Sequence, residues 1–519
     1  MFNLSIYTGH NASFTISRDD EILEVVELER WLNVKNISLT WYLPTTHNPI
    51  HAVKEILLYF KIKYGADKYQ NLICNPTDLE VLTGGYWSAH GSVLDIFNAK
   101  NLIEMGHQEG HAYNAFYQTN LKEATIISFD GGGNDGCFNF YKATRQNGVT
   151  LYRTEPDYNI GEKYAQIGFY CSSLSKQDRF QGYLVHSGKL MGLSAYGKIL
   201  HNNINNFLEY YKGHHSTYED KYNNYKKLGY PDELTGQLEV DVVRTSQYAF
   251  EQLFEKLSYK DIIGSDDKLC LTGGCALNVL NNTQVNKLTK THVTPNPDDR
   301  GLSLGFMLGF LKPSDAFDST YIGPEVWDRH LLHEYVNKYN ATEVDFTKLA
   351  EDLISGKIIG IVRGRSEHGA RALGNRSILC MPTVGMKDIL NAKVKHREYY
   401  RPFAPVTRLE DANTYFDWEG EARWMTFSPR VKTEYRSILP SVTHIDNTAR
   451  LQTVTEMQNS FLYHLLGEVK RLSGVGVLIN TSFNIAGKPI LNTYRDAVWM
   501  LENVEMDGLI LENYYIKKD

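Results

Sequence analysis

The chain has 519 residues, of which 42% are hydrophobic and 22% charged, and its formal net charge is −7. This length is too great for a single hydrophobic core, so we expect two or more domains. The composition is that of an ordinary folded protein. A net negative charge argues against a surface that coats nucleic acid, because phosphate backbones demand a strong positive field. We therefore expect no nucleic-acid partner.

The chain begins with short apolar runs. Runs over 4–7, 14–17 and 22–26 are separated by turn residues and predict a strand-turn-strand meander, and a helical pattern follows over 49–64. No positively charged leader precedes the first run, and no apolar run is long enough to cross a membrane. We expect a cytoplasmic protein without a membrane partner.

Two β-rich runs, 124–129 and 268–272, each end in a glycine-rich turn. Glycines let a backbone turn toward a bound anion, and the second turn leads into a helix expected from 275, whose N-terminus would attract anions. This recurrence predicts a duplicated α/β unit with a nucleotide-sized cleft between its halves, although a purely structural role for the glycines remains open. The candidate nucleotide-binding residues here are Asp130, Gly131, Gly132, Gly273, Gly274 and Asn278.

Two histidines, His107 and His111, are four residues apart, so on a helix they share one face and can bind one metal ion. Their order is not H-E-x-x-H, which disfavours a metalloprotease, and such a pair can also be incidental. Asp130 and the pair Asp298-Asp299 are candidates for further ligands. Histidines with carboxylates suit Fe(II), Mn(II) or Zn(II), and the residues do not choose among these ions.

Between the predicted halves, the segment 201–230 is crowded with Asn, Tyr, Lys and His. We expect a helical insertion there, with a mobile flap as the alternative, and its role stays open. A change of composition over 312–324 predicts a domain boundary, which gives domains 1–325 and 326–519.

A helix expected over 345–353 leads into a strand over 358–362 and then into 364–376, which interleaves three arginines with three glycines. Arginine presents a planar fork of donors that fits phosphate oxygens, and glycines let backbone N–H groups approach the same anion. A solvated surface loop is the alternative. Basic residues continue beyond this loop, which predicts a site for a polyanionic small molecule with the candidates Arg371, Arg376, Lys395, Arg397 and Arg401.

Further motifs accompany these in a fixed order: 9–13 (GHNAS), 130–133, 188–197, 273–278, Asp299 before Gly301, 364–379, 395–398, 401–405, 450–454 and 480–484. Together with the histidine pair, they make the chain resemble, over nearly its whole length, the O-carbamoyltransferases of the nodulation-factor, tobramycin and cephamycin type. Asn11 stands where that family commonly has aspartate. His368 and Ala370 stand where an aromatic residue and a proline are common.

The resemblance implies an α/β fold in two parts: an N-terminal actin/Hsp70-like (ASKHA) duplicated domain and a C-terminal domain similar to the threonylcarbamoyl-adenylate synthases. In such enzymes the C-terminal domain converts carbamoyl phosphate and ATP to carbamoyl adenylate and pyrophosphate. The N-terminal domain then moves the carbamoyl group to an acceptor hydroxyl. The implied partners are ATP with Mg²⁺, carbamoyl phosphate and a hydroxyl-bearing small molecule such as a sugar, nucleoside or antibiotic. A homodimer is also an expectation.

The resemblance also implies roles for individual residues. His10 would be the general base near the acceptor, and Lys395 with Arg397 would form the catalytic K-x-R pair. A divalent ion, Fe(II) before Mn(II) or Zn(II), would be held against the adenylate phosphate by His107, His111, Asp130 and Asp299. The site for ATP and carbamoyl phosphate would include Arg371, Arg376, Arg401, Arg450, Asn480, Ser482 and Asn484.

Two other functions stay open. One is an enzyme of the tRNA threonylcarbamoylation type, against which the fusion of both domains and the net negative charge argue. The other is a non-enzymatic, actin-like nucleotide-binding scaffold, which would need only the glycine turns. The histidine pair and the C-terminal basic residues argue against the scaffold.

Overall fold

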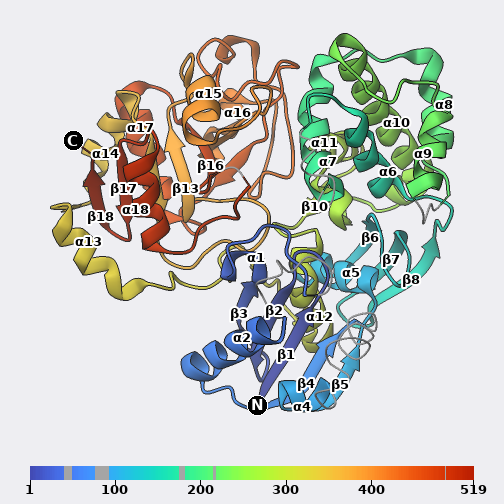
Figure 1. Ribbon diagram of the computed structural model, residues 1–519, viewed down its shortest axis with the longest axis horizontal. Helices are drawn as coiled ribbons and strands as arrows, with labels where there is room; N and C mark the ends of the chain where they lie inside the picture. The colour runs from blue at the N-terminus through green and yellow to red at the C-terminus, as the bar shows by residue number, and fades with distance from the viewer. Residues whose placement is uncertain (40–48, 76–92, 175–181, 214–217, 486, 519) are drawn as a thin grey trace. The chain divides into compact units, whose positions relative to one another are not determined.

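The computed structural model describes residues 1–39, 49–75, 93–174, 182–213, 218–485 and 487–518. The chain forms two compact units (Figure 1). The first unit comprises 1–32 with 36–318, and the second comprises 33–35 with 319–519. No helix in the described ranges is long and apolar enough to span a membrane.

The first unit opens with a five-stranded sheet in the order β3-β2-β1-β4-β5. Its first three strands form the predicted antiparallel meander, whereas β1, β4 and β5 run parallel. The helix predicted over 49–64 is α2, which leads into β4. The bounds are β1 Phe2–Tyr7, β2 Ser13–Arg18, β3 Glu21–Glu27, α2 Pro49–Tyr64, β4 Tyr69–Cys74 and β5 Ala99–Glu104.

A second five-stranded sheet repeats this arrangement in the order β10-β9-β6-β7-β8. β6, β7 and β8 are antiparallel, and β6, β9 and β10 are parallel. The predicted α/β class with a duplicated first part is therefore confirmed. The bounds are β6 Glu123–Phe129, β7 Phe138–Thr144, β8 Gly148–Thr154, β9 Leu269–Thr272 and β10 Thr291–Val293.

The two glycine turns that suggested the duplication do not mark its two copies. They follow β6 and β9, which are neighbouring parallel strands of the same sheet. The second turn also differs from the prediction, because residues Gly274–Leu277 form a 3₁₀ turn and the helix α11 (Val279–Leu288) begins only after Asn278. The carboxyl ends of parallel neighbours meet at one edge, so both turns lie together.

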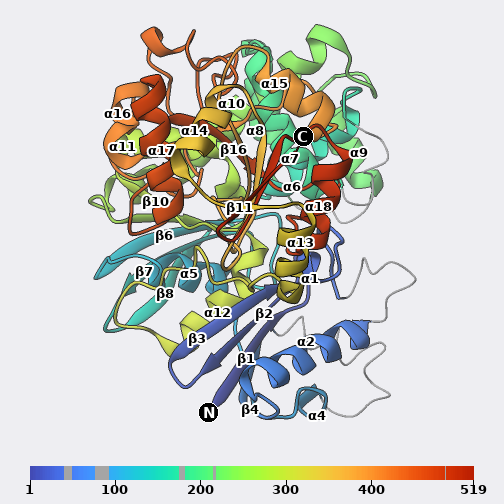
Figure 2. The ribbon, with the colours of Figure 1, turned by 90° about the vertical axis from the view of Figure 1, so that its left-hand side faces the viewer.

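Each half of the first unit ends in a helix that crosses to the sheet of the other half. α5 (His107–Tyr117) follows β5 and packs against β6 and β9, whereas α12 (Leu302–Leu311) follows β10 and packs against β1 and β2 (Figure 2). The helices meet at glycines: a Cβ atom on Gly305 would lie 2.1 Å from the carbonyl oxygen of Gly110. The residues that begin α5 and α12 thus occupy equivalent places in the repeat.

Between β8 and β9 lies a helical region built around α10 (Gly236–Ile263), which packs against α6, α7, α8 and α11 (Figure 1). The described part of the insertion predicted over 201–230 contains a 3₁₀ turn (His201–Asn203) and two α-helices, and 214–217 lie outside the described residues. An ion pair of 2.6 Å between Lys221 Nζ and Glu162 Oε1 joins this insertion to α6. The bounds are α6 Ile160–Gln166, α7 Gly182–Leu193, α8 Ile204–Tyr210 and α9 Tyr218–Lys226.

The second unit is built on an eight-stranded mixed sheet in the order β11-β18-β17-β12-β13-β16-β14-β15. α14 and α17 pack together over an apolar core to which Ile361, Leu379 and Leu478 contribute from the strands. The helix and strand predicted over 345–353 and 358–362 are α14 and β12. The bounds are β11 Thr342–Glu343, α14 Phe346–Ile354, β12 Ile359–Val362, β13 Arg376–Cys380, β14 Ala404–Arg408, β15 Gln452–Val454, α17 Ser460–Ser473, β16 Val477–Ser482, β17 Gly508–Leu511 and β18 Tyr514–Lys517.

Candidate metal centre and anion-binding cluster

The four predicted metal ligands come together in the first unit, where equivalent elements of the repeat meet. The two histidines lie on the first two turns of α5, one aspartate follows β6, and the other begins the 3₁₀ turn before α12. Their ligand atoms all lie within 4.8 Å of one another in the cluster His107, His111, Asp130 and Asp299.

The distances in this cluster suit a shared cation. His111 Nε2 lies 3.0 Å from Asp130 Oδ2 and 3.4 Å from Asp299 Oδ1, and His107 Nε2 lies 3.5 Å from Asp299 Oδ1. His111 is fully buried, and neither of its ring nitrogens makes a hydrogen bond within the described ranges. Two neutral imidazoles with two carboxylates carry a charge of −2, which a divalent ion neutralises. The residues therefore fit a metal, and the set does not choose among Fe(II), Mn(II) and Zn(II).

Burial disfavours the charged form of each of the four side chains in the cluster, but the attraction between the histidines and the carboxylates outweighs this effect. Burial would lower the pKa of His107, but Asp299 and Asp130 raise it well above its usual value. Burial and the charge of Asp299 would raise the pKa of Asp130, but the attraction of the two adjacent histidines holds it below its usual range. Without a metal the cluster therefore binds protons, and a metal must displace them.

Further contacts orient both carboxylates. Asp130 Oδ2 accepts a hydrogen bond from the Gly274 N–H at 3.0 Å, and Asp299 Oδ2 accepts one from the hydroxyl of Tyr7 at 2.5 Å. Hydrogen bonds of this kind fix the direction in which a ligand presents its other oxygen to the metal. Tyr7 was not among the predicted site residues, and its only local signal is its place at the end of the first predicted strand.

His10 lies in the turn between β1 and β2, the place in the repeat equivalent to that of Asp130 between β6 and β7. Its Nε2 is 3.2 Å from Asp299 Oδ2, and 38% of its side chain is exposed. The tautomer protonated at Nε2 suits this carboxylate, which leaves Nδ1 as the basic nitrogen. The side-chain nitrogen of Asn11 lies 3.3 Å from Nδ1. His10 is thus both adjacent to the metal cluster and accessible.

The predicted nucleotide-binding turns lie beside this cluster, and several of their N–H groups are used inside the protein. Gly274 donates to Asp130, Gly131 donates to the other oxygen of the same carboxylate at 2.6 Å, and Gly273 donates to the carbonyl of Pro297 at 2.8 Å. A Cβ atom on Gly132 would meet no atom within 4 Å. Direct contact of these glycines with a nucleotide stays a prediction.

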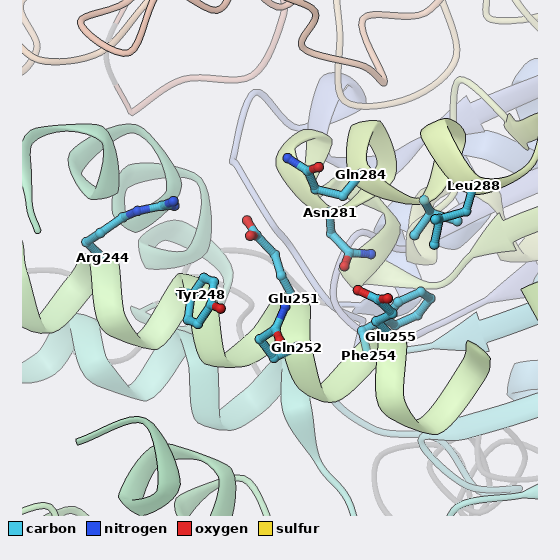
Figure 3. Close-up of a pocket in the computed structure, with 10 residues that line it drawn as sticks. Arg244, Tyr248, Glu251, Gln252, Phe254, Glu255, Asn281, Gln284 and Leu288 are labelled. Atoms are coloured by element: carbon cyan, nitrogen blue, oxygen red, sulfur yellow. The ribbon is translucent and has the colours of Figure 1, made fainter. Parts of the chain in front are cut away.

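Asn278 caps α11, since its Oδ1 accepts the N–H of Asn281 at 3.1 Å, and it also exchanges side-chain hydrogen bonds with Gln247 of α10. Next to this pair, a pocket of about 250 Å³ opens between α10 and α11 (Figure 3). Figure 3 shows Glu251 and Asn281 directed into the space between the helices. The lining residues were missed because they are spread along two helices that carry no motif; they are Arg244, Tyr248, Glu251, Gln252, Phe254, Glu255, Asn281, Gln284, Val285 and Leu288.

In the second unit, the predicted basic residues crowd together. Burial lowers the pKa of Lys395 well below its usual value, and the charges of Arg397 and Arg401 lower it further. Burial likewise lowers the pKa of Arg450, followed by the charges of Arg371, Arg397 and Arg401. The structure thus collects five predicted cations in one place, where an anion would relieve their repulsion.

The motif pairs K-x-R and S-x-N are in direct contact. Lys395 Nζ donates to the carbonyl oxygen of Ser482 at 2.7 Å and to Oδ1 of Asn484 at 2.6 Å. The hydroxyl of Ser482 donates to the same Asn484 oxygen at 2.6 Å. Arg397 donates from Nε to Asn391 Oδ1 at 2.8 Å, and its guanidinium lies 4.4 Å from the centre of the Phe403 ring.

Arg376 and Asn480 have mainly internal contacts. The fully buried guanidinium of Arg376 donates to Asn492 Oδ1 at 3.0 Å and to the carbonyl oxygens of Arg363, Gly364 and Asn375. Asn480 Nδ2 donates to Gln452 Oε1 at 2.6 Å. Direct anion contacts by these two side chains stay predictions.

The loop 364–376 also differs from the prediction in how it uses its backbone. Three of its N–H groups, those of Leu373, Asn375 and Arg376, donate to Oε1 of Glu367 instead of facing a ligand. Glu367 is fully buried. These three N–H groups are therefore used by an internal carboxylate, and anion contacts elsewhere in the loop stay a prediction.

Comparisons with known proteins agree with these two units. The family models described as Carbamoyltransferase N-terminus and Carbamoyltransferase C-terminus match residues 62–308 and 350–518. The nodulation protein NolO of Bradyrhizobium diazoefficiens is 30% identical over 80% of this chain and 79% of its own length. The 3'-hydroxymethylcephem-O-carbamoyltransferase of Streptomyces clavuligerus is 34% identical over 48% of this chain and 49% of its own.

A further relative, the nodulation protein NolNO of Sinorhizobium fredii, is 28% identical over 98% of this chain and 79% of its own length. Among solved structures, the HypF of T. kodakarensis is similar over 60% of this chain and 47% of that one, with 13% identity and a TM-score of 0.35. Because both family models match in order and the relative NolO aligns over most of its length, the chain belongs to the carbamoyltransferase family and is a carbamoyltransferase.

Proposed function

We propose that the protein is an ATP-dependent O-carbamoyltransferase. Residues 326–519 form carbamoyl adenylate from carbamoyl phosphate and ATP, and residues 1–325 transfer the carbamoyl group to a hydroxyl of a small molecule such as a sugar, nucleoside or antibiotic. The observation that carries this proposal is the crowding of Lys395 with four arginines, in which burial and then the neighbouring positive charges lower the pKa of Lys395, Arg397 and Arg450.

The first reaction brings several negative charges together. Water first hydrolyses carbamoyl phosphate to carbamate and phosphate. A carbamate oxygen then attacks the α-phosphorus of ATP, the bond from that phosphorus to the bridging oxygen breaks, and pyrophosphate leaves with Mg²⁺. Cations must offset the repulsion between these anions before attack can occur. Arg397 and Arg450 supply that field, and Lys395 is already held in place by Ser482 and Asn484. A polyanion bound here would remove the repulsion among the cations.

The pocket between α10 and α11 is our candidate for the nucleoside part of the adenylate in the first unit. Tyr248 lines it with an aromatic ring, on which a base can stack. Asn281 is buried and its Nδ2 has no hydrogen-bond partner within the described part of the chain, so it can donate to a ring nitrogen. Burial raises the pKa of Glu251, whose carboxyl group can bond to ribose hydroxyls. At about 250 Å³ the pocket is smaller than most ligand sites, which favours the nucleoside part over a whole nucleotide.

In the second reaction, a divalent ion held by the four-residue cluster would act as a Lewis acid on the adenylate phosphate and favour the departure of AMP. Nδ1 of His10 accepts the proton of the acceptor hydroxyl, while Asp299 holds the imidazole through Nε2. The hydroxyl oxygen forms a bond to the carbamoyl carbon, and the bond between that carbon and the phosphate oxygen breaks. His10 thus serves as general base for the transfer.

The test is to incubate the purified protein with ATP, carbamoyl phosphate and Fe(II), without an acceptor, and to search for carbamoyl adenylate and pyrophosphate by mass spectrometry. Product that requires carbamoyl phosphate supports the proposal and leaves only the acceptor to be found by screening. No product from a protein that binds ATP would refute the adenylate route and favour a different acyl donor.

A further inference from the structure

The loop 364–376 is organised by one buried carboxylate. Oε1 of Glu367 accepts hydrogen bonds from the N–H groups of Leu373 at 2.7 Å, Asn375 at 2.8 Å and Arg376 at 3.1 Å. The side chain is 0% exposed, and its second oxygen, Oε2, has no hydrogen-bond partner within the described residues. A carboxylate with three backbone donors on one oxygen is strongly held, so it fixes the conformation of the residues that donate to it.

From this carboxylate a continuous chain of hydrogen bonds runs to the strands that carry the anion-binding cluster. The carbonyl oxygen of Leu373, whose N–H bonds to Glu367, accepts from Gln452 Nε2 at 3.0 Å. Gln452 Oε1 in turn accepts from Asn480 Nδ2 at 2.6 Å, and this amide also donates to the carbonyl oxygen of Ala372 at 3.3 Å. All members of the chain are buried or within the loop backbone.

Gln452 begins β15 two residues after Arg450, and Asn480 lies on β16 two residues before Ser482. β13, which begins at Arg376, pairs with β16 so that Ser377 lies opposite Ser482. The network therefore ties the arginine loop to both strands at the points where the cluster's side chains emerge. A shift of the loop would be transmitted to Arg450 and Ser482.

We propose that Glu367 is a positioning residue for the anion site of the second unit, acting through Leu373, Gln452 and Asn480. This inference rests on the proposed function of that unit, since it assumes that the cluster binds a polyanion. Glu367 does not contact the ligand itself. Its charge opposes anion binding electrostatically, so its contribution comes from geometry.

The positioning of the loop by Glu367 should raise the affinity for an anion, whereas the negative charge of Glu367 should lower it. Isothermal titration calorimetry of the full-length protein with inorganic pyrophosphate can therefore tell the two contributions apart. Glu367→Gln keeps the shape of the side chain but places a buried NH2 group, which needs an acceptor, where Oε2 now lies without a hydrogen-bond partner in the described part of the chain. We expect pyrophosphate to bind about tenfold more weakly, because small displacements of binding groups cost one to two orders of magnitude. A purely electrostatic role predicts tighter binding.

The matched control is Glu398→Gln, which removes a negative charge 3.7 Å from Arg401 at a residue other than Glu367, Leu373, Gln452 and Asn480. Pyrophosphate should bind more tightly to this variant than to the wild type. Gln452→Leu breaks the next link of the network while leaving Glu367 intact, and it should weaken binding like Glu367→Gln. If circular dichroism shows that Glu367→Gln does not fold, Gln452→Leu serves as the test variant in its place.

The outcomes separate this inference from the proposed function. If the wild type does not bind pyrophosphate, both fail. If the wild type binds and the folded Glu367→Gln or Gln452→Leu variants bind with unchanged or higher affinity, only the positioning role of Glu367 is overturned.

Discussion

Gly273 offers a direct test of whether a glycine turn exists for the fold or for a ligand. In the structure Gly273 has φ +87° and ψ 164°, a conformation essentially restricted to glycine. A Cβ atom there would lie 2.3 Å from the carbonyl oxygen of Phe129, at the end of β6. Because the nearest atoms belong to the backbone, relief requires movement of the strand that precedes Asp130.

We expect Gly273→Ala to lower the free energy of unfolding of the first unit by about 3 kcal/mol. The unfavourable backbone conformation costs roughly 1–3 kcal/mol, and the steric overlap adds to it. Alanine also lowers the conformational entropy of the unfolded chain, which offsets only about 0.4–1 kcal/mol of this destabilisation. Gly132→Ala is the matched control, since a Cβ atom at Gly132 would meet nothing within 4 Å, and its stability should change by no more than about 1 kcal/mol.

The assay is urea unfolding of both variants and the wild type, followed by far-ultraviolet circular dichroism, together with ATP binding by calorimetry on the folded proteins. Equal stability of the two variants would refute the structural role of Gly273. A stable Gly273→Ala protein that had lost ATP binding would instead establish the ligand contact predicted from the sequence.

Three further predictions concern catalysis and the metal centre. His10→Asn should still form carbamoyl adenylate but fail to transfer the carbamoyl group, whereas Arg397→Ala should abolish adenylate formation, with the products of both reactions measured by mass spectrometry. Loss of both reactions in the His10 variant would contradict the assignment of the two reactions to separate sites. Tyr7→Phe removes the hydroxyl that donates to Asp299 and should weaken metal binding about tenfold, measured by competition with a chelator, with unchanged affinity as the opposing result. Metal affinity should fall by at least about tenfold per unit of pH below the raised pKa of His107, because there each bound ion must displace at least one proton. Calorimetry at several pH values in buffers of different ionisation enthalpy would detect the released protons, and a pH-independent affinity would contradict the prediction.

Local patterns predicted the local structure well. The meander, α2, α14 and β12 follow from alternation, helical periodicity and turn residues, all of which act over a few positions. The placement of His107 and His111 on one helix face follows in the same way. The start of α11 was placed too early, because a 3₁₀ turn and an Asn cap share the composition of a first helical turn.

Motif order and periodicity are written along the chain, so they sufficed to predict the family, the two α/β parts and the residue types of both candidate sites. The folded chain was needed to tell which of two adjacent aspartates joins the candidate metal cluster: Asp299 faces His107 and His111, whereas Asp298 pairs with Arg300. The folded chain also shows that Tyr7 orients that aspartate, and that Glu367 organises the arginine loop. These contacts depend on how strands pair and helices cross between segments that are far apart in the chain. Pairing and crossing set the direction of each side chain, and no local sequence pattern contains that information.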